Sequence, residues 1–369
     1  MSRSTSIPRT VGQALAAPLV ALVVAVLVTS VVIVVAGASV GDFWSVLFTA
    51  PSGRNIVNIT NQSAMIFLSA LAAAIGFRMN LFNIGVEGQY TIASYFAALV
   101  AGQALLPGKF NVLLALVVAV AVGALWAGIA GVLKVTRGVS EVISTIMLNA
   151  IAITLVGYLL SNHGEQYGQG RRTTPIPASS TFAGWSPFGE ADGAIWVLVL
   201  LALLAGIGMS VLINRTRFGF DLRATGMNAE AAIASGVDVK KMVVISMLLS
   251  GGIAGLIWMP ALFNGAGYYG PPFQAQLGFT GIAVALLGRN QPLGIFFGAA
   301  LFAWLSEQAN PLGLIADISP SVVQVTQGVV VLAVVIAYEV VRRWKAASEQ
   351  RALREALVPS SDDEAAVNA

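Results

Sequence analysis

Ten apolar stretches dominate this chain of 369 residues and constrain its fold more than any other feature. Most of them approach the roughly 20 residues that a helix needs to cross the hydrocarbon core of a bilayer. They lie at about 17–37, 58–77, 83–104, 111–133, 141–161, 194–213, 241–262, 276–289, 292–309 and 322–341. Only 10% of the residues are charged, against roughly 25% in soluble domains. The sequence therefore predicts an all-α integral membrane protein with about ten transmembrane helices, some of them short or broken.

Two of these stretches are weak as continuous spans. The stretch 83–104 begins with polar residues, and the stretch 276–289 is short and contains Gly278, Gly281 and Gly288. Irregular backbone at membrane depth is tolerated only where it is buried in protein or lines a cavity. We therefore expect either stretch to be broken or re-entrant.

The basic residues predict the orientation of the spans. An even number of spans puts both termini on one side, and cytoplasmic segments carry an excess of Lys and Arg. Of the 20 Lys and Arg residues, 16 fall on one side and only four on the other: Arg54, Lys109, Arg171 and Arg172. We therefore expect a cytoplasmic N-terminus at 1–16, a transmembrane domain at 17–341 and a cytoplasmic tail at 342–369.

The first stretch has a second interpretation. Arg3 and Arg9 precede it, and it ends in Ala36-Gly37-Ala38, which is similar to a signal-peptidase site. Its apolar run of about 20 residues is longer than the 7–15 of a secretory signal. This length favours an uncleaved first helix.

The composition excludes several kinds of site. The chain has no Cys and a single His, His163, in a polar stretch, so we expect no disulfide and no metal site. Its three excess positive charges are spread between apolar runs, unlike the clustered charge of a nucleic-acid-binding domain. No nucleophile–base set stands out, so we expect no catalytic residues and no nucleic-acid partner.

Two segments outside the spans are long. Residues 162–193 form the longest outside loop, rich in Gly, Ser, Thr and Pro, and 214–240 the longest inside loop. The inside loop contains a helix signal, because Asn228 is a good N-cap, helix-forming residues follow, and Gly236 is a good stop. Glu230 in the first turn suits the helix dipole. A short, nearly uncharged helix exposed to water predicts docking into a groove on another cytoplasmic protein.

This helix resembles the coupling helix in the permease subunits of ABC importers. The run Glu230–Gly236 matches their EAA-x-x-x-Gly pattern. The Ile-x-Leu-Pro that often follows is absent, as in the branch that carries branched-chain amino acids, simple sugars and nucleosides. The resemblance assigns coupling to the ATPase to five residues: Asn228, Glu230, Ala231, Ala232 and Gly236.

Three further segments resemble the nucleoside permeases within that branch: Asn80–Gln89, Glu141–Asn149 and Gly278–Gly294. The first is the most specific. Sugar permeases typically have Asp-Leu-Ser-Val-Gly there, and amino-acid permeases Asn-Phe-Ala-His-Gly. The resemblance covers roughly 58–341 and favours nucleosides over simple sugars or branched-chain amino acids.

The resemblance also implies partners and a location. A dimer of permeases would form the path in the cell membrane of a prokaryote, with a different chain as the second permease in the nucleoside branch. Two cytoplasmic ATP-binding subunits would grip the coupling helices, and an extracytoplasmic binding lipoprotein would deliver the substrate. This chain lacks a Gly-x-x-x-x-Gly-Lys-Ser/Thr loop, so we expect ATP on the partner subunits and no cofactor on this chain.

Polar side chains within the spans are candidates for the path, because a charged one costs about 2.5–3.5 kcal/mol at mid-helix. Their spacing predicts that Asn80, Asn83 and Glu87 share one helix face, with Gln89 close by. Amides and a carboxylate suit the hydroxyls and base edges of a nucleoside. Alternatively, these residues hydrogen-bond a broken helix to its neighbours.

Other polar residues carry two interpretations each. Three more amides either line the path or pin helices together: Asn149, Gln324 and Gln327. Glu141 is predicted to form a salt bridge at the cytoplasmic end, near Lys134. Glu307 and Gln308 are expected at a solvated outer rim. Tyr269 either anchors the chain at the interface or stacks on a nucleobase.

A different class remains open, the ion-coupled secondary transporters. These carry acidic residues deep in their spans, and Glu87 is the main candidate here. The docking helix in 214–240 has no role in such a protein, which favours the ABC permease.

Overall fold

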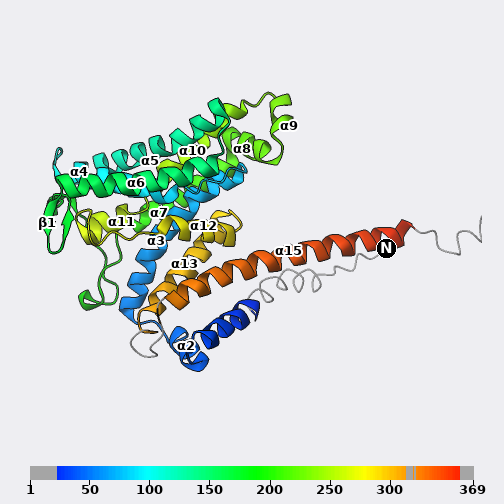
Figure 1. Cartoon of the computed structure of the whole chain (residues 1–369), viewed down its shortest axis with the longest axis horizontal. Coiled ribbons are helices and arrows are strands. Elements are labelled where there is room, and N and C mark those ends of the chain that lie inside the picture. The colour runs from blue at the N-terminus through cyan, green and yellow to red at the C-terminus, as the bar shows by residue number, and fades with distance from the viewer. Residues whose placement is uncertain (1–22, 313–318, 320, 358–369) are drawn as a thin grey trace, which may run out of the picture. The chain divides into compact units, whose positions relative to one another are not determined.

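The computed structural model describes residues 23–312, 319 and 321–357, and the chain is largely helical (Figure 1). It comprises two compact units. One is Val46–Asn310, and the other contains the described parts of Met1–Ser45 and Pro311–Ala369. The predicted N-terminal segment 1–16 and the end of the tail, 358–369, lie outside the described residues.

Helices make up most of the Val46–Asn310 unit. Before the outside loop these are α3 (Gly53–Arg78), α4 (Val86–Gly102), α5 (Lys109–Arg137) and α6 (Glu141–His163). After it come α7 (Val199–Arg215), α8 (Arg217–Met227), α9 (Ala229–Ala234), α10 (Val239–Gly255), α11 (Met259–Ala261), a π-helical turn η3 (Leu262–Ala266), α12 (Leu277–Leu287) and α13 (Pro292–Ala309). The other unit contains a helix at Val23–Val35 and the long α15 (Ser321–Leu357), and α2 (Val40–Leu47) runs across the division between the units.

Several of these helices can cross a bilayer. Among the described residues, four pass on length and composition: Gly53–Arg78, Lys109–Arg137, Glu141–His163 and Val239–Ala266. The pair α7 and α8 would add a fifth, although it bends by 73° at the junction. Shorter apolar helices include α12 and the first part of α15. The helical, membrane-spanning class is thus confirmed, whereas the number of ten spans stays a prediction.

Small residues let α5 and α10 pack closely. A Cβ atom on Gly123 would overlap the carbonyl of Gly251, and one on Gly255 would overlap the carbonyl of Ala119. Apolar side chains gain little from each other in lipid, so close backbone approach of this kind is a main source of helix association there.

An irregular segment, called here an interruption, precedes the helix of each weak span, whereas α4 and α12 themselves are short and continuous. Residues 79–85 are largely non-helical, and α4 begins only at Val86. The prediction that Asn80 shares a helix face with Asn83 and Glu87 is therefore wrong, because Asn80 has a left-handed φ of 57° just after α3 ends. The second interruption is a largely irregular segment at 267–276, from which the short α12 begins.

The outside loop folds along the second interruption. It contains a hairpin of β1 (Glu165–Tyr167) and β2 (Gly170–Arg172), in which Gln166 pairs with Arg171. Further along, the Thr173 N–H donates to the Tyr269 carbonyl at 2.9 Å. The hairpin lies at the opposite end of the Val46–Asn310 unit from α9 (Figure 1). This arrangement agrees with an outside loop and an inside loop.

The last predicted span and the start of the tail are one helix. Helix α15 runs without a break for 37 residues, so the structure has no boundary at 341. Gln324 is exposed on this helix and Gln327 is partly buried.

Candidate functional site

The inside loop folds as two short helices with side-chain caps. Thr216 accepts a hydrogen bond from the Gly219 N–H at 3.1 Å and so begins α8. The Asn228 side chain accepts from the Ala231 N–H at 3.0 Å and begins α9. Gly236 follows α9 with a φ of +85°. The predicted exposed helix and both of its end signals are confirmed.

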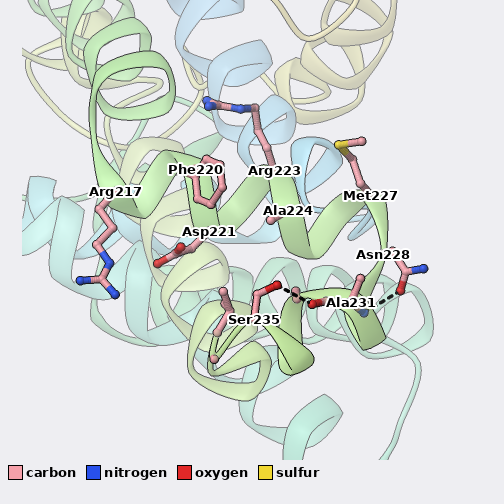
Figure 2. Close-up of a pocket in the computed structure, with 12 residues that line it drawn as sticks. Arg217, Phe220, Asp221, Arg223, Ala224, Met227, Asn228, Ala231 and Ser235 are labelled. Carbon is pink, nitrogen blue, oxygen red and sulfur yellow. Dashed lines mark hydrogen bonds between the residues drawn. The ribbon is translucent and has the colours of Figure 1, made fainter.

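Helices α8 and α9 enclose a hollow of about 600 Å³ (Figure 2). These helices carry three exposed apolar side chains. Phe220 is 62% exposed, Met227 88% and Ile233 60%. Arg217 and Asp221 add charge at the lining of the hollow. Phe220 and Met227 also line the hollow, whereas Ile233 lies outside its lining. Large apolar side chains exposed together on surface helices mark protein-interaction sites. We call Phe220, Met227 and Ile233 the docking patch. The sequence pattern predicted the contribution of α9 but not that of α8.

Helix α8 also packs against the chain that leads into the first interruption. Leu222 is buried in a cluster with Met79, Leu81, Met242 and Val243. A Cβ atom on Gly226 would overlap the carbonyl of Arg78, so the α8 backbone lies directly against the end of α3. A displacement of the docking patch would therefore reach residues 79–85 through packed side chains rather than through a flexible linker.

Asn83 and Gln89 form a closed pair of amides inside the first interruption. The Asn83 Nδ2 donates to Gln89 Oε1 at 3.1 Å, and Gln89 Nε2 donates to Asn83 Oδ1 at 2.9 Å. Asn83 Nδ2 also donates to the Ser250 hydroxyl at 2.8 Å, which in turn donates to the Ala72 carbonyl at 2.6 Å. Both amides are buried. The pair thereby links the interruption to α3 and α10.

Asn149 pins α6 to the same interruption. Its Oδ1 accepts from the Gly88 N–H and its Nδ2 donates to the Ile84 carbonyl, both at 2.8 Å. Both partners are backbone groups next to the start of α4, where the helical hydrogen-bond ladder is incomplete.

Glu87 links the first interruption to the second. Its Oε1 accepts from the Gln276 N–H at 2.7 Å, and its Oε2 accepts from the Gly278 N–H at 2.9 Å. The Tyr90 hydroxyl lies 3.0 Å from Oε1. A carboxylate at the first turn of α12 satisfies free N–H groups and interacts favourably with the helix dipole.

The geometry thus supports the interpretation in which these polar residues hydrogen-bond a broken helix to its neighbours. In this conformation, the side chains of Asn83, Glu87, Gln89 and Asn149 bond to backbone groups and to neighbouring side chains. Asn80 is exposed and outside the cluster. Contact between any of these residues and a substrate stays a prediction.

Three expectations at the span ends have different outcomes. Glu141 forms the expected salt bridge to Lys134, at 2.5 Å. The solvated rim is wrong for Glu307 and Gln308, because both are buried. Glu307 Oε1 accepts hydrogen bonds from the side-chain amides of Asn55 and Asn58 at 3.0 Å each. The positions of these residues in the sequence do not indicate this contact.

Tyr269 is buried in a cluster of rings. Its ring centroid lies 4.6 Å from that of Phe273, which lies 5.1 Å from Trp258 and stacks on Tyr90 at 5.3 Å. Tyr90 joins this cluster to the Glu87 carboxylate, because its hydroxyl lies 3.0 Å from Glu87 Oε1. Tyr269 therefore packs within the protein in this conformation, instead of standing at the membrane interface.

Long apolar helices in the described residues define a multi-pass membrane protein. The chain belongs to the family described as branched-chain amino acid transport system / permease component, whose model matches residues 55–337. The resemblance to ABC permeases is thereby confirmed.

Individual relatives cover most of the chain. It is 35% identical to the guanosine ABC transporter permease protein NupP of Bacillus subtilis, over 88% of this chain and 93% of that protein. It is 29% identical to the nucleoside ABC transporter permease protein NupB of Lactococcus lactis, over 87% and 90%. It is 27% identical to the glucose ABC transporter permease protein TsgB13 of Haloferax volcanii, over 89% and 88%.

Replacing Asn149 separates its two interpretations. If it pins α6 to α4, Asn149→Ala leaves two buried backbone groups unpaired, and the free energy of unfolding should fall by about 1–3 kcal/mol. We expect a lower melting temperature in detergent. Asn162→Ala is the matched control, because it removes an exposed amide at the other end of the same helix. A melting temperature equal to that of the control, together with weaker uptake, would instead assign Asn149 to the path.

Proposed function

We propose that this chain is the transmembrane permease subunit of an ABC importer for nucleosides. The observation that carries the proposal is the 35% identity to a guanosine permease along 88% of the chain. A simple sugar is the second candidate, since a glucose permease is 27% identical over a similar length.

The proposed partners meet the two ends of the Val46–Asn310 unit. Two cytoplasmic ATP-binding subunits receive the docking patch of α8 and α9 and hold the ATP, and this chain binds no cofactor. A second permease, a different chain, completes the path. A binding lipoprotein delivers the nucleoside at the end that carries the β1–β2 hairpin. Both termini are cytoplasmic, and residues 17–341 span the cell membrane.

Transport proceeds by alternating access. ATP-driven closure of the partner subunits displaces α9, and the packing of Leu222 on Met79 passes this movement to the first interruption. Glu87 passes it on to α12, because the carboxylate holds the first turn of that helix. The path runs beside the two interruptions, where Asn83, Gln89 and Asn149 brace its wall.

The docking patch can be tested without disturbing the membrane domain. Ile233→Asp puts a charge on an exposed apolar side chain, so the permease should fold normally and lose affinity for its ATP-binding subunits. An aspartate at this position would bury an unpaired charge in the docked complex, and burying a charge without a partner costs several kcal/mol. We expect at least a tenfold drop in the subunits that copurify.

Trp185→Asp is the control for this experiment, because Trp185 is 68% exposed in the outside loop. Normal copurification of the ATP-binding subunits with the Ile233 variant would contradict the assignment of the docking patch.

The substrate class is tested by competition. Cells that express the complete importer should take up radiolabelled guanosine, and unlabelled nucleosides should suppress this uptake at least tenfold. Glucose and leucine in the same excess should leave it unchanged. Suppression by glucose would favour the sugar candidate instead.

A further inference from the structure

The second interruption lies deep within the span region. The Ser69 hydroxyl of α3 donates to the Leu277 carbonyl at 2.8 Å, so it marks the depth at which α12 begins. Ser69 is nine residues from the end of α3 at Arg78, or about 14 Å at 1.5 Å per residue. Helix α12 therefore starts well inside the bilayer, and the segment 267–276 descends to that depth from the outer side.

Gln276 occupies the bottom of this segment in an unusual backbone conformation. Its φ is +70°, in the left-handed region, where residues other than Gly are uncommon. Such a conformation persists when the surroundings enforce it. Here the Gln276 N–H is bonded to the Glu87 carboxylate, and the Gln276 carbonyl accepts from the Thr280 hydroxyl at 3.0 Å.

The Gln276 side chain, by contrast, is exposed. No side chain or backbone group among the described residues hydrogen-bonds its amide. Ala275 beside it is also exposed, and Phe279 on the next turn is 49% exposed. An irregular backbone with a free amide at this depth needs water or protein around it, since lipid offers no hydrogen bonds. In transporters, interrupted helices of this kind surround the substrate path.

The Glu87 side chain, unlike that of Gln276, is buried. It is 3% exposed, and its oxygens are bonded to α12 and Tyr90. A Cβ atom on Gly278 would overlap the backbone of Glu87, so α4 and α12 are in direct contact there. Glu87 can fix the position of Gln276 without reaching the space that Gln276 faces.

We propose that Gln276 faces the water-filled path and hydrogen-bonds the passing nucleoside, and that Glu87 is the positioning residue that holds it there. A carboxamide offers both a donor and an acceptor, as base edges and ribose hydroxyls require. This inference rests on the proposed function for the identity of the substrate, but not for the position of Gln276.

The absence of Cys from the chain makes this position directly measurable. Gln276→Cys introduces a single thiol, which a charged methanethiosulfonate reagent can modify only from water. In the complete importer in membranes, we expect modification, slowed at least fivefold by guanosine. Leu204→Cys is the control, because Leu204 is 66% exposed on the apolar face of α7, and its rate should not respond to guanosine.

The positioning role has a separate readout. Glu87→Gln in the Gln276→Cys chain should change the modification rate at least threefold without any nucleoside present, because the start of α12 is no longer held. Glu141→Gln, at another buried glutamate with a side-chain partner, should leave that rate unchanged. An unchanged rate for the Glu87 variant, with weaker protection by guanosine, would mean that Glu87 contacts the nucleoside itself.

Two outcomes separate this inference from the proposed function. If the unmodified importer takes up guanosine but Gln276→Cys is unreactive or unprotected, Gln276 faces the second permease or lipid and the inference is overturned. If the unmodified importer does not take up guanosine, the substrate assignment fails. Reactivity of Gln276→Cys that changes on adding ATP would then still support its place in the path.

Discussion

The contact between the Glu87 carboxylate and the first turn of α12 is the interaction on which the interrupted spans depend. A helix that begins inside a bilayer leaves N–H groups without partners, at a cost on the order of several kcal/mol for each group. Glu87 satisfies two of them. Glu87 can reach them because α4 also begins inside the protein. There Asn149 hydrogen-bonds the backbone of the first interruption, and Asn83 and Gln89 hydrogen-bond each other. Each interruption therefore stabilises the other.

This arrangement connects the two ends of the Val46–Asn310 unit. The docking patch lies on α8 and α9, α8 packs against Met79 at the end of α3, and the chain then enters the first interruption directly. From there Glu87 reaches α12 and the segment that descends from the outside loop. Packed helices switch between discrete arrangements more readily than they deform, so a movement at one end can be passed to the other through these contacts.

Local signals in the sequence predicted what depends on local structure. The cap at Asn228, the stop at Gly236 and the shortness of α4 and α12 follow from the residues at those positions. The prediction that Asn80 and Asn83 share a helix face was wrong because it assumed a continuous helix. The spacing of residues does not reveal that one of them has a left-handed backbone conformation. The burial of Glu307 depends on amides about 250 positions away. The partners of Glu87 are backbone N–H groups 189 and 191 positions away, and backbone groups leave no mark in the sequence.

In the proposed mechanism, an ATP-driven movement carries nucleosides past these interruptions. The decisive measurement is guanosine import into proteoliposomes that contain the complete importer and its binding protein, with ATP supplied on the side of the ATP-binding subunits. We expect import that requires ATP hydrolysis and proceeds without any ion gradient. Import driven by a sodium or proton gradient in the absence of ATP would contradict it, and would make Glu87 the coupling residue of a secondary transporter.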